Sequence, residues 1–241
     1  MPTSPANLSP GTLSSGTIQL LLESQSFELL AQEVRGRHNG EPLSFELLWR
    51  PRHPVTAEPL DPGTTANLLS PDQSIELAAL SLAMVPSDVP VSVNLHADAF
   101  TPYAVERLAE CHDRLTIEIT ESRPLHPSAT SARGLAERLG VIIALDDAGS
   151  ELCGTERIDA IRPDVVKLDR NVLLDLRTGL LLSTHARRVG ATLVSEGIES
   201  RQHLLIADIL GADAVQGWAI ALPLPVSELA PRPNGPGCHT A

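Results

Sequence analysis

Aromatic side chains are scarce in this sequence, which contains three Phe, two Trp and one Tyr among 241 residues. Hydrophobic residues still make up 42% of the chain, so its core has to be built from Leu, Ile, Val and Ala. Cysteine is also rare, since Cys111, Cys153 and Cys238 stand far apart and show no CxxC spacing. This spacing indicates neither a disulfide framework nor a zinc ribbon, and it is typical of a protein in a reducing cytoplasm.

Positive charge is the second shortage, with 18 Lys and Arg against 30 Asp and Glu and a net charge of −12. This balance argues against non-specific binding to a nucleic-acid polymer or to an anionic membrane. No apolar run reaches membrane-spanning length, and the N-terminus lacks the basic start and apolar core of a signal peptide. We therefore expect a cytoplasmic protein in which any anionic ligand needs local cations or a bound metal.

The chain divides into two tails and one domain. Residues 1–16 are rich in Pro, Ser, Thr and Gly and are predicted to form a disordered tail, and residues 231–241 a flexible C-terminal tail. The domain between them, residues 17–230, has no internal repeat. Eight segments in it are predicted as strands: 27–34, 43–49, 91–95, 115–119, 141–145, 165–168, 191–195 and 214–218.

The connections between these segments predict the fold. An Asn39-Gly40 turn joins the first two strands, which indicates an antiparallel hairpin. Helices are expected after Ser70-Pro71 and near 102–112, 128–139, 172–189 and 200–210, and three of them end at a glycine: Gly140, Gly190 and Gly211. From the second strand on, strands and helices alternate, which is typical of a parallel sheet with crossover helices. Eight strands favour an α/β fold with a closed (β/α)8 barrel, and an open doubly wound sheet is the alternative.

The segment from Val141 to Asp147 is the most informative. Five apolar residues predict a strand buried on both faces, and two adjacent carboxylates follow where that strand ends. Adjacent acids repel each other, so the pair indicates a metal site unless one of them simply caps the next helix.

Polar residues recur at the ends of the other strands as well. They are Glu46, Asn94, Glu118, Glu121, Asp146, Asp147, Lys167, Asp169, Glu196, Glu199 and Gln216. In a barrel these ends meet on one face, where active sites lie. Oxygen ligands without His or Cys suit a hard cation, Mg²⁺ or Mn²⁺.

An ordered series of motifs makes the chain resemble the EAL domain family, which contains cyclic di-GMP phosphodiesterases. The series is Glu46-Leu-Leu-Trp-Arg50, Val93-Asn-Leu95, Glu118-Ile-Thr-Glu-Ser122, Asp146-Asp-Ala-Gly149, Lys167-Leu-Asp169, Ser195-Glu-Gly-Ile-Glu199 and Gln216-Gly-Trp218. The resemblance covers residues 26 to 225 and implies a modified TIM barrel whose first two strands are antiparallel.

The resemblance also implies a role for each motif residue. Ligands for a first metal would be Glu46, Asn94, Glu118 and Asp146, with Asp146, Asp147 and Glu196 around a second. Lys167 and Glu196 would orient the attacking water, Arg50 would contact substrate phosphate, Gln216 would lie on the far rim, and Glu121 would anchor the loop after the fifth strand. Two metals about 4 Å apart can activate a water and shield phosphate charge. The resemblance therefore implies metal-dependent hydrolysis of cyclic di-GMP to linear pGpG, in a homodimer that can act with a signalling protein partner.

Some positions depart from the family pattern. The signature triplet has Leu47 in its second position, where the family has Ala, and His96 stands where the family has Ser. The segment from Ala148 to Thr155 replaces the family's Phe-Gly-Thr-Gly-Tyr-Ser-Ser-Leu loop and lacks its Phe, its Tyr and one glycine. The altered loop supports one alternative to the enzyme, a catalytically weak or inactive cyclic di-GMP receptor acting through a protein partner. A third hypothesis is an interaction module without nucleotide, and the intact acidic residues argue against it. We expect His96 not to be a metal ligand and Cys153 to be an unreactive small side chain.

Overall fold

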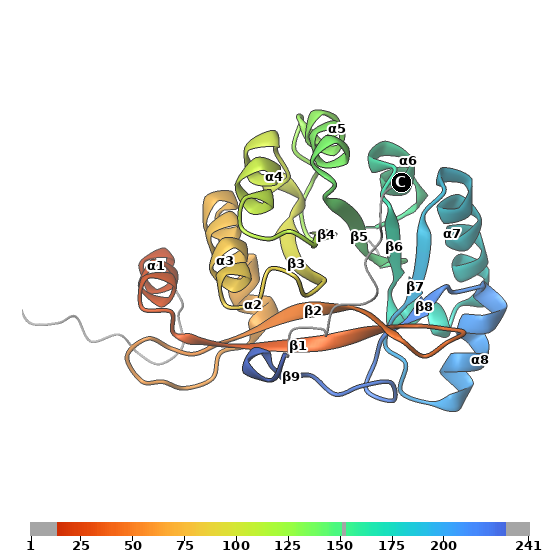
Figure 1. Ribbon diagram of the computed structural model, residues 1–241, viewed down its shortest axis with the longest axis horizontal. Helices are drawn as coiled ribbons and strands as arrows, with labels where there is room; N and C mark the ends of the chain where they lie inside the picture. The colour runs from red at the N-terminus through yellow and green to blue at the C-terminus, as the bar shows by residue number, and fades with distance from the viewer. Residues whose placement is uncertain (1–13, 151–152, 230–241) are drawn as a thin grey trace, which may run out of the picture.

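The computed structural model describes residues 14–150 and 153–229, which form a closed barrel (Figure 1). Its strands are β1 (Phe27–Gly36), β2 (Pro42–Pro51), β3 (Val91–His96), β4 (Leu115–Thr120), β5 (Ile142–Ala148), β6 (Val165–Leu168), β7 (Thr192–Ser195), β8 (Ala214–Val215) and the short β9 (Leu224–Pro225). Neighbouring strands pair in the order β2 to β8, and β1 closes the ring between β8 and β2. The predicted modified barrel is confirmed, and the open sheet is excluded.

The first strand is antiparallel to both of its barrel neighbours, whereas β2 to β8 are parallel. The hairpin turn is longer than a two-residue Asn-Gly turn, because Gly36 N donates to Glu41 O at 2.9 Å. Asn39 Oδ1 accepts from Glu41 N at 3.2 Å, and Gly40 has a φ of 68°. The predicted hairpin is confirmed, with strands that extend beyond the predicted ends.

Helices cover the barrel in an arc from α3 to α8, and β1 and β2 run along the side that this arc leaves open (Figure 1). The helices are α1 (Ser15–Glu23), α2 (Pro62–Asn67), α3 (Pro71–Ala83), α4 (Pro102–Ala109), α5 (Ala129–Leu139), α6 (Thr155–Ile161), α7 (Leu176–Val189) and α8 (Arg201–Leu210), with 3₁₀ turns at Ala97–Ala99, Arg170–Leu173 and Val226–Glu228. Ser70 and Gln73 form a capping box at α3, and Gly140, Gly190 and Gly211 end their helices in the left-handed conformation, as predicted.

Three helices, α1, α2 and α6, were not predicted, and α1 changes the expected boundary of the domain. Helix α1 begins at Ser15, so the last two residues of the predicted N-terminal tail are helical. Ser14 caps the helix by accepting from Thr17 N, and Leu21 and Leu22 are buried against Leu69 and Leu77. Helix α6 has seven residues, too few to show a hydrophobic period. Of the predicted tails, residues 1–13 and 231–241 lie outside the described residues.

Most of the core lies between the strands and the surrounding helices. Aliphatic side chains dominate it, and Phe100 is the only one of the six aromatic residues that is buried. Inside the barrel, Val34, Val194 and Ala214 form a separate small cluster. Within residues 14–150 and 153–229, no helix combines the length and apolar character needed to span a bilayer.

Gly217, directly after β8, predicts a large stability effect. Its φ is 151°, and a Cβ there would lie 2.2 Å from the backbone nitrogen of Ile198. We expect Gly217→Ala to lower the free energy of unfolding by about 3 kcal/mol, from backbone strain and this clash. Urea denaturation measures the change.

Gly190→Ala is the matched control, because Gly190 also has a positive φ, 84°, but open space around its Cβ position. We expect a loss of only about 1 kcal/mol there. Equal losses for the two variants would contradict the clash at Gly217.

Candidate metal centre at the barrel mouth

A bulge in β5 brings two consecutive carboxylates to the same side. Successive side chains of a regular strand point to opposite faces. The pairing of β5 with β6 shifts register between Leu145 and Ala148, and Asp147 has a φ of 50°. Oxygen atoms of Asp146, Asp147 and Glu196 consequently lie within 4.8 Å of one another. Neither acid caps the next helix, since the N-cap of α6 is Gly154, so the helix-cap interpretation is wrong.

Lys167 lies at the centre of the acidic cluster. Its Nζ is 2.6 Å from Glu118, 2.8 Å from Glu196, 3.1 Å from Asp146 and 3.2 Å from Glu46. It is 2% exposed and is the only lysine of the chain. Burial alone would lower the pKa of Lys167, but the surrounding carboxylates, led by Asp146 and Glu118, raise it well above its usual value. The ammonium group therefore stays protonated.

The carboxylates outnumber this one cation. Burial raises the pKa of Glu118, Asp146 and Glu196, and burial together with the charge of Asp146 raises that of Asp147 to about 8. Burial also opposes ionisation of Glu46, but Lys167 and hydrogen bonds from Asn94 and Gln216 outweigh it and lower the pKa of Glu46. A cluster with this excess of acid is stabilised either by bound protons or by divalent cations.

Two amides complete the cluster and support the fit of a hard cation. Asn94 Nδ2 donates to Glu46 Oε1 at 2.9 Å, and Gln216 Nε2 donates to Glu46 Oε2 at 2.7 Å. The oxygens Asn94 Oδ1 and Gln216 Oε1 are buried and have no hydrogen-bond partner among the described residues. A buried acceptor without a donor is costly, and a metal ion would satisfy it. Gln216 was expected on the far rim, but it is 3% exposed and lies inside the cluster.

The structure thus brings the four predicted ligands of the first metal together. Glu46, Glu118 and Asp146 contact Lys167, and Asn94 contacts Glu46. Sequence reasoning missed Gln32 on β1, which donates to Ala221 O at 3.1 Å and accepts from Gln216 at 3.4 Å. A single uncharged polar residue in an otherwise mixed strand gave no clear signal.

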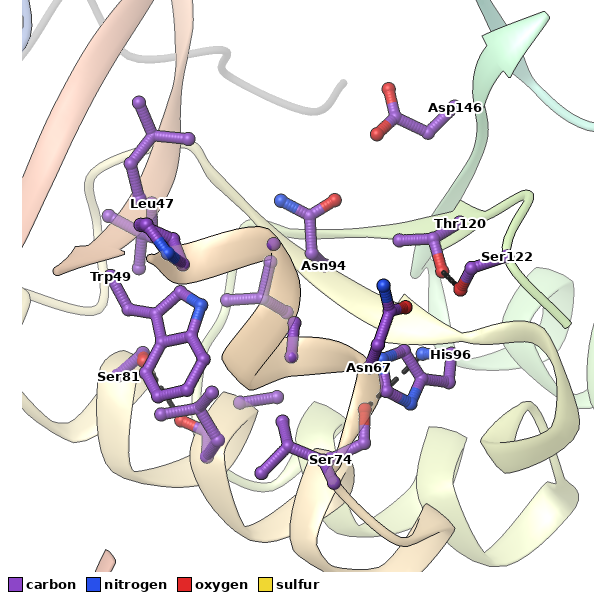
Figure 2. Close-up of a pocket in the computed structure, with 18 of the residues that line it drawn as sticks. Leu47, Trp49, Asn67, Ser74, Ser81, Asn94, His96, Thr120, Ser122 and Asp146 are labelled. Atoms are coloured by element: carbon purple, nitrogen blue, oxygen red, sulfur yellow. Dashed lines mark hydrogen bonds between the residues drawn. The ribbon is translucent and has the colours of Figure 1, made fainter. Parts of the chain in front are cut away.

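Two cavities flank the cluster and share Asp147. The larger has a volume of about 350 Å³ and an apolar wall from β2, α2 and α3. Figure 2 shows Leu47 and Trp49 on one side of it, with Asn94 and Asp146 facing it from the other. The smaller, about 250 Å³, is lined mainly by polar residues of β1, β2 and the segments that follow β7 and β8, together with Asp169, Arg170 and Trp218. The cluster therefore lies between two compartments of the barrel mouth.

Arg50 and Glu121 lie on the wall of the larger cavity and are not part of the acidic cluster around Lys167. Arg50 Nη1 donates to Trp49 O at 3.0 Å. Within the part of the chain that the structure describes, the Glu121 side chain makes no hydrogen bond or ion pair. Arg157 on α6 instead holds the segment after β4, donating to Thr120 O at 3.1 Å and to Arg123 O. The anchoring role of Glu121 stays a prediction.

His96 and Cys153 are both buried near this mouth. Burial lowers the pKa of His96 to about 4, so its ring is neutral. Burial raises the pKa of Cys153 to about 12, which leaves it a thiol without thiolate reactivity, as expected from sequence.

Comparison with known proteins identifies the family. A family model described as EAL domain matches residues 16–223. The chain belongs to the EAL domain family. It is 26% identical to the probable cyclic di-GMP phosphodiesterase PdeN of Escherichia coli K12 and 24% identical to the cyclic di-GMP phosphodiesterase PdeL of the same strain. The alignments cover 88% and 86% of this chain but only 46% of PdeN and 65% of PdeL.

Solved EAL structures share the fold of this EAL domain. The PaMucR phosphodiesterase in complex with c-di-GMP aligns with a TM-score of 0.67 and 22% identity, covering 89% of this chain and 98% of that one. The EAL enzyme Bd1971, bound to cAMP and cyclic di-GMP, aligns with a TM-score of 0.72 and 21% identity, covering 88% of this chain and 66% of that one. At these identities the likeness supports the barrel.

The raised carboxyl pKa values predict how pH affects the metal-free EAL domain. Asp147 moves from an ordinary pKa of 3.8 to about 8, so the folded state keeps a proton that the unfolded chain releases. Stability contributed by this proton is lost as pH rises toward 8. We expect the melting temperature in chelator to decrease as pH is raised from about 6.5 to 8.5. The ordinary pKa of the buried His96 and His112 is 6.5, so titration of these two residues contributes little within this window.

Asp147→Asn isolates this effect, because the amide cannot titrate. Its melting temperature should change less over the same window, and added Mg²⁺ or Mn²⁺ should reduce the pH dependence of the unsubstituted protein. Differential scanning calorimetry at four pH values measures both. A melting temperature that rises with pH in chelator would contradict the prediction.

Proposed function

We propose that this EAL domain is a metal-dependent phosphodiesterase that hydrolyses cyclic di-GMP to linear pGpG. One observation carries the proposal: four carboxylates, three of them buried and that of Glu196 partly buried, surround Lys167 at a barrel mouth that opens into two cavities. Membership in the EAL domain family supports the same substrate. So do the relatives PdeN and PdeL, which are named as a probable cyclic di-GMP phosphodiesterase and a cyclic di-GMP phosphodiesterase.

The residues present fit two hard cations, Mg²⁺ or Mn²⁺. Glu46, Asn94, Glu118 and Asp146 would hold one, and Asp146, Asp147 and Glu196 the other. Bound metals would supply positive charge to the phosphate and lower the pKa of an attacking water. Asp146 would be a ligand in both sets, so a change in the position of its carboxylate would affect both metal sites.

Lys167 and Glu196 would both act on the attacking water. Lys167 stays protonated, so it can donate a hydrogen bond and stabilise negative charge but cannot accept a proton. Glu196 Oε1 lies 2.8 Å from Lys167 Nζ, and its carboxylate, ionised beside bound metals, would accept the proton of the water. The developing charge on phosphorus oxygens would face Lys167 and the metals.

The shape of the mouth supports a cyclic dinucleotide, and bound metals together with Arg50 would supply the positive charge that its two phosphates need. A phosphate at the acidic cluster leaves one cavity on each side for a nucleoside, and the larger has the apolar wall that a purine requires. Arg50 lines this cavity and would contact phosphate. PaMucR and Bd1971, which share the barrel, are complexes with this dinucleotide.

The decisive experiment is incubation of purified protein with cyclic di-GMP and Mg²⁺ or Mn²⁺, followed by chromatographic separation of cyclic and linear products. We expect pGpG to appear in the presence of metal and not in chelator. Tight binding without turnover would instead support a receptor, and absence of binding would support an interaction module. The cytoplasmic location stays a prediction from the composition, and the homodimer and a signalling partner stay predictions from the resemblance.

A further inference from the structure

The barrel contains a third cavity, on the side of the acidic cluster away from the mouth. It has a volume of about 370 Å³. Glu118 and Lys167 form its inner end, and exposed residues including Leu43 and Ile142, 45% and 44% exposed, lie at its outer end. None of its lining residues lines either mouth cavity. It is therefore a separate compartment that opens at the amino-terminal ends of the parallel strands.

Strand register explains why this compartment is empty of side chains. Glu118 faces the barrel interior, and its neighbours in register, Asn94 and Ala144, share that face. The residues two positions before the cluster residues therefore form the next interior layer, and none of them is larger than valine: Ser44, Ser92, Thr116, Ala144, Val165, Val194 and Ala214. The interior of a TIM barrel is normally filled by layers of bulky side chains. None of the six aromatic residues of this chain lines the interior space.

The layer has two chemically different sides. Hydroxyl side chains come from three adjacent strands, as Ser44 on β2, Ser92 on β3 and Thr116 on β4. The opposite side is aliphatic, with Val194, Ala214 and Val34 packed together. Ser92 is 2% exposed, and its Oγ has no hydrogen-bond partner among the described residues. A buried hydroxyl of this kind normally has a partner.

We propose that this inner cavity binds a small, flat, mainly apolar molecule with one hydroxyl or N–H group, which pairs with Ser92. An apolar cavity of about 150 Å³ holds a single benzene ring, so the present volume accommodates one substituted ring or two fused rings. The aliphatic side would contact the ring, and Ser92 would fix its polar edge. This site does not depend on the proposed phosphodiesterase activity.

A matched pair of probes, 4-methylphenol and toluene, tests the proposal with the full chain. Isothermal titration should show one saturable site, with 4-methylphenol bound more tightly than toluene. Ser92→Ala should reduce the affinity for 4-methylphenol by about three- to tenfold, the value of one hydrogen bond, and leave toluene unchanged. Ser195→Ala is the control, because Ser195 Oγ is also buried and has no hydrogen-bond partner within residues 14–150 and 153–229, but it does not line the cavity.

Val194→Phe should fill the aliphatic side and weaken both probes at least tenfold. Circular dichroism establishes whether this variant folds, and if it does not, Ser92→Ala decides the result. Crystals soaked in 4-methylphenol should show the ring next to Ser92. Absence of saturable binding at millimolar probe, unchanged binding in Ser92→Ala, or only water in the cavity of soaked crystals would overturn the proposal.

Discussion

Replacing Lys167 with methionine is expected to reduce the turnover of cyclic di-GMP by about 10²- to 10³-fold, whereas the affinity for the dinucleotide changes only a few-fold. The two effects differ because a preorganised charge at the reacting centre acts mainly in the transition state. Methionine keeps an unbranched side chain in the 2% exposed site but removes the charge that contacts four carboxylates. Single-turnover kinetics with saturating metal, together with titration of the dinucleotide in Ca²⁺, separates the two quantities.

Arg138→Met is the matched control, since Arg138 is an exposed cation in the last turn of α5 and lines neither mouth cavity. Its turnover should equal that of the unsubstituted protein. Unchanged hydrolysis in Lys167→Met would exclude the proposed role of Lys167.

The burial of Lys167 has a consequence that can be measured without an activity assay. Lys167 is the only lysine of the chain, so the amino terminus is the only other primary amine that an acylating reagent can modify. Because Lys167 is buried and its pKa is raised, we expect acylation of the native protein at the amino terminus alone. Modification of Lys167 should begin only in denaturant, and mass spectrometry of peptides measures it.

Replacing Asp146 with asparagine is expected to have the second large effect. Asp146 contacts Lys167 at 3.1 Å and also belongs to the group that includes Asp147 and Glu196. Loss of its charge removes a ligand from both proposed metals, so turnover should fall by about 10²-fold or more. The rise in melting temperature on adding Mn²⁺ should also become much smaller.

In chelator the effect of Asp146→Asn should have the opposite sign. Burial raises the pKa of Asp146, so its ionised form opposes folding at pH 8. The metal-free variant should therefore melt at a higher temperature than the unsubstituted protein at that pH. Asp72→Asn, an exposed acid in the first turn of α3, is the control and should change neither measurement strongly. A metal response in Asp146→Asn equal to that of the unsubstituted protein would contradict the proposed metal centre.

The loop after Asp147 bears on how such variants are interpreted. Sequence comparison by motif singled out Ala148 to Thr155 as different from the family pattern. Its described residues form compact turns, with Gly149 N donating to Cys153 O at 2.9 Å and Ser150 N donating to Asp147 O at 3.1 Å. These bonds hold the backbone beside Asp147 without the aromatic residues of the family loop, so the bulge does not depend on them.

The sequence by itself determined the order of the strands and the polar residues at their ends. Apolar runs such as 141–145 and the Asn39-Gly40 turn are local signals, and parallel strands in a barrel necessarily bring their carboxyl ends to one face. For this reason the sequence alone groups the four residues Glu46, Glu118, Asp146 and Lys167.

Only the tertiary structure decided how these residues face one another and what lies behind them. The bulge at Asp147, the inclusion of Gln32 and Gln216 in the cluster, and the cavity behind Lys167 depend on pairing between segments far apart in the chain. A side chain's direction at a bulge and the volume left inside a closed barrel arise from such pairing. Neither has a local pattern that a sequence can display.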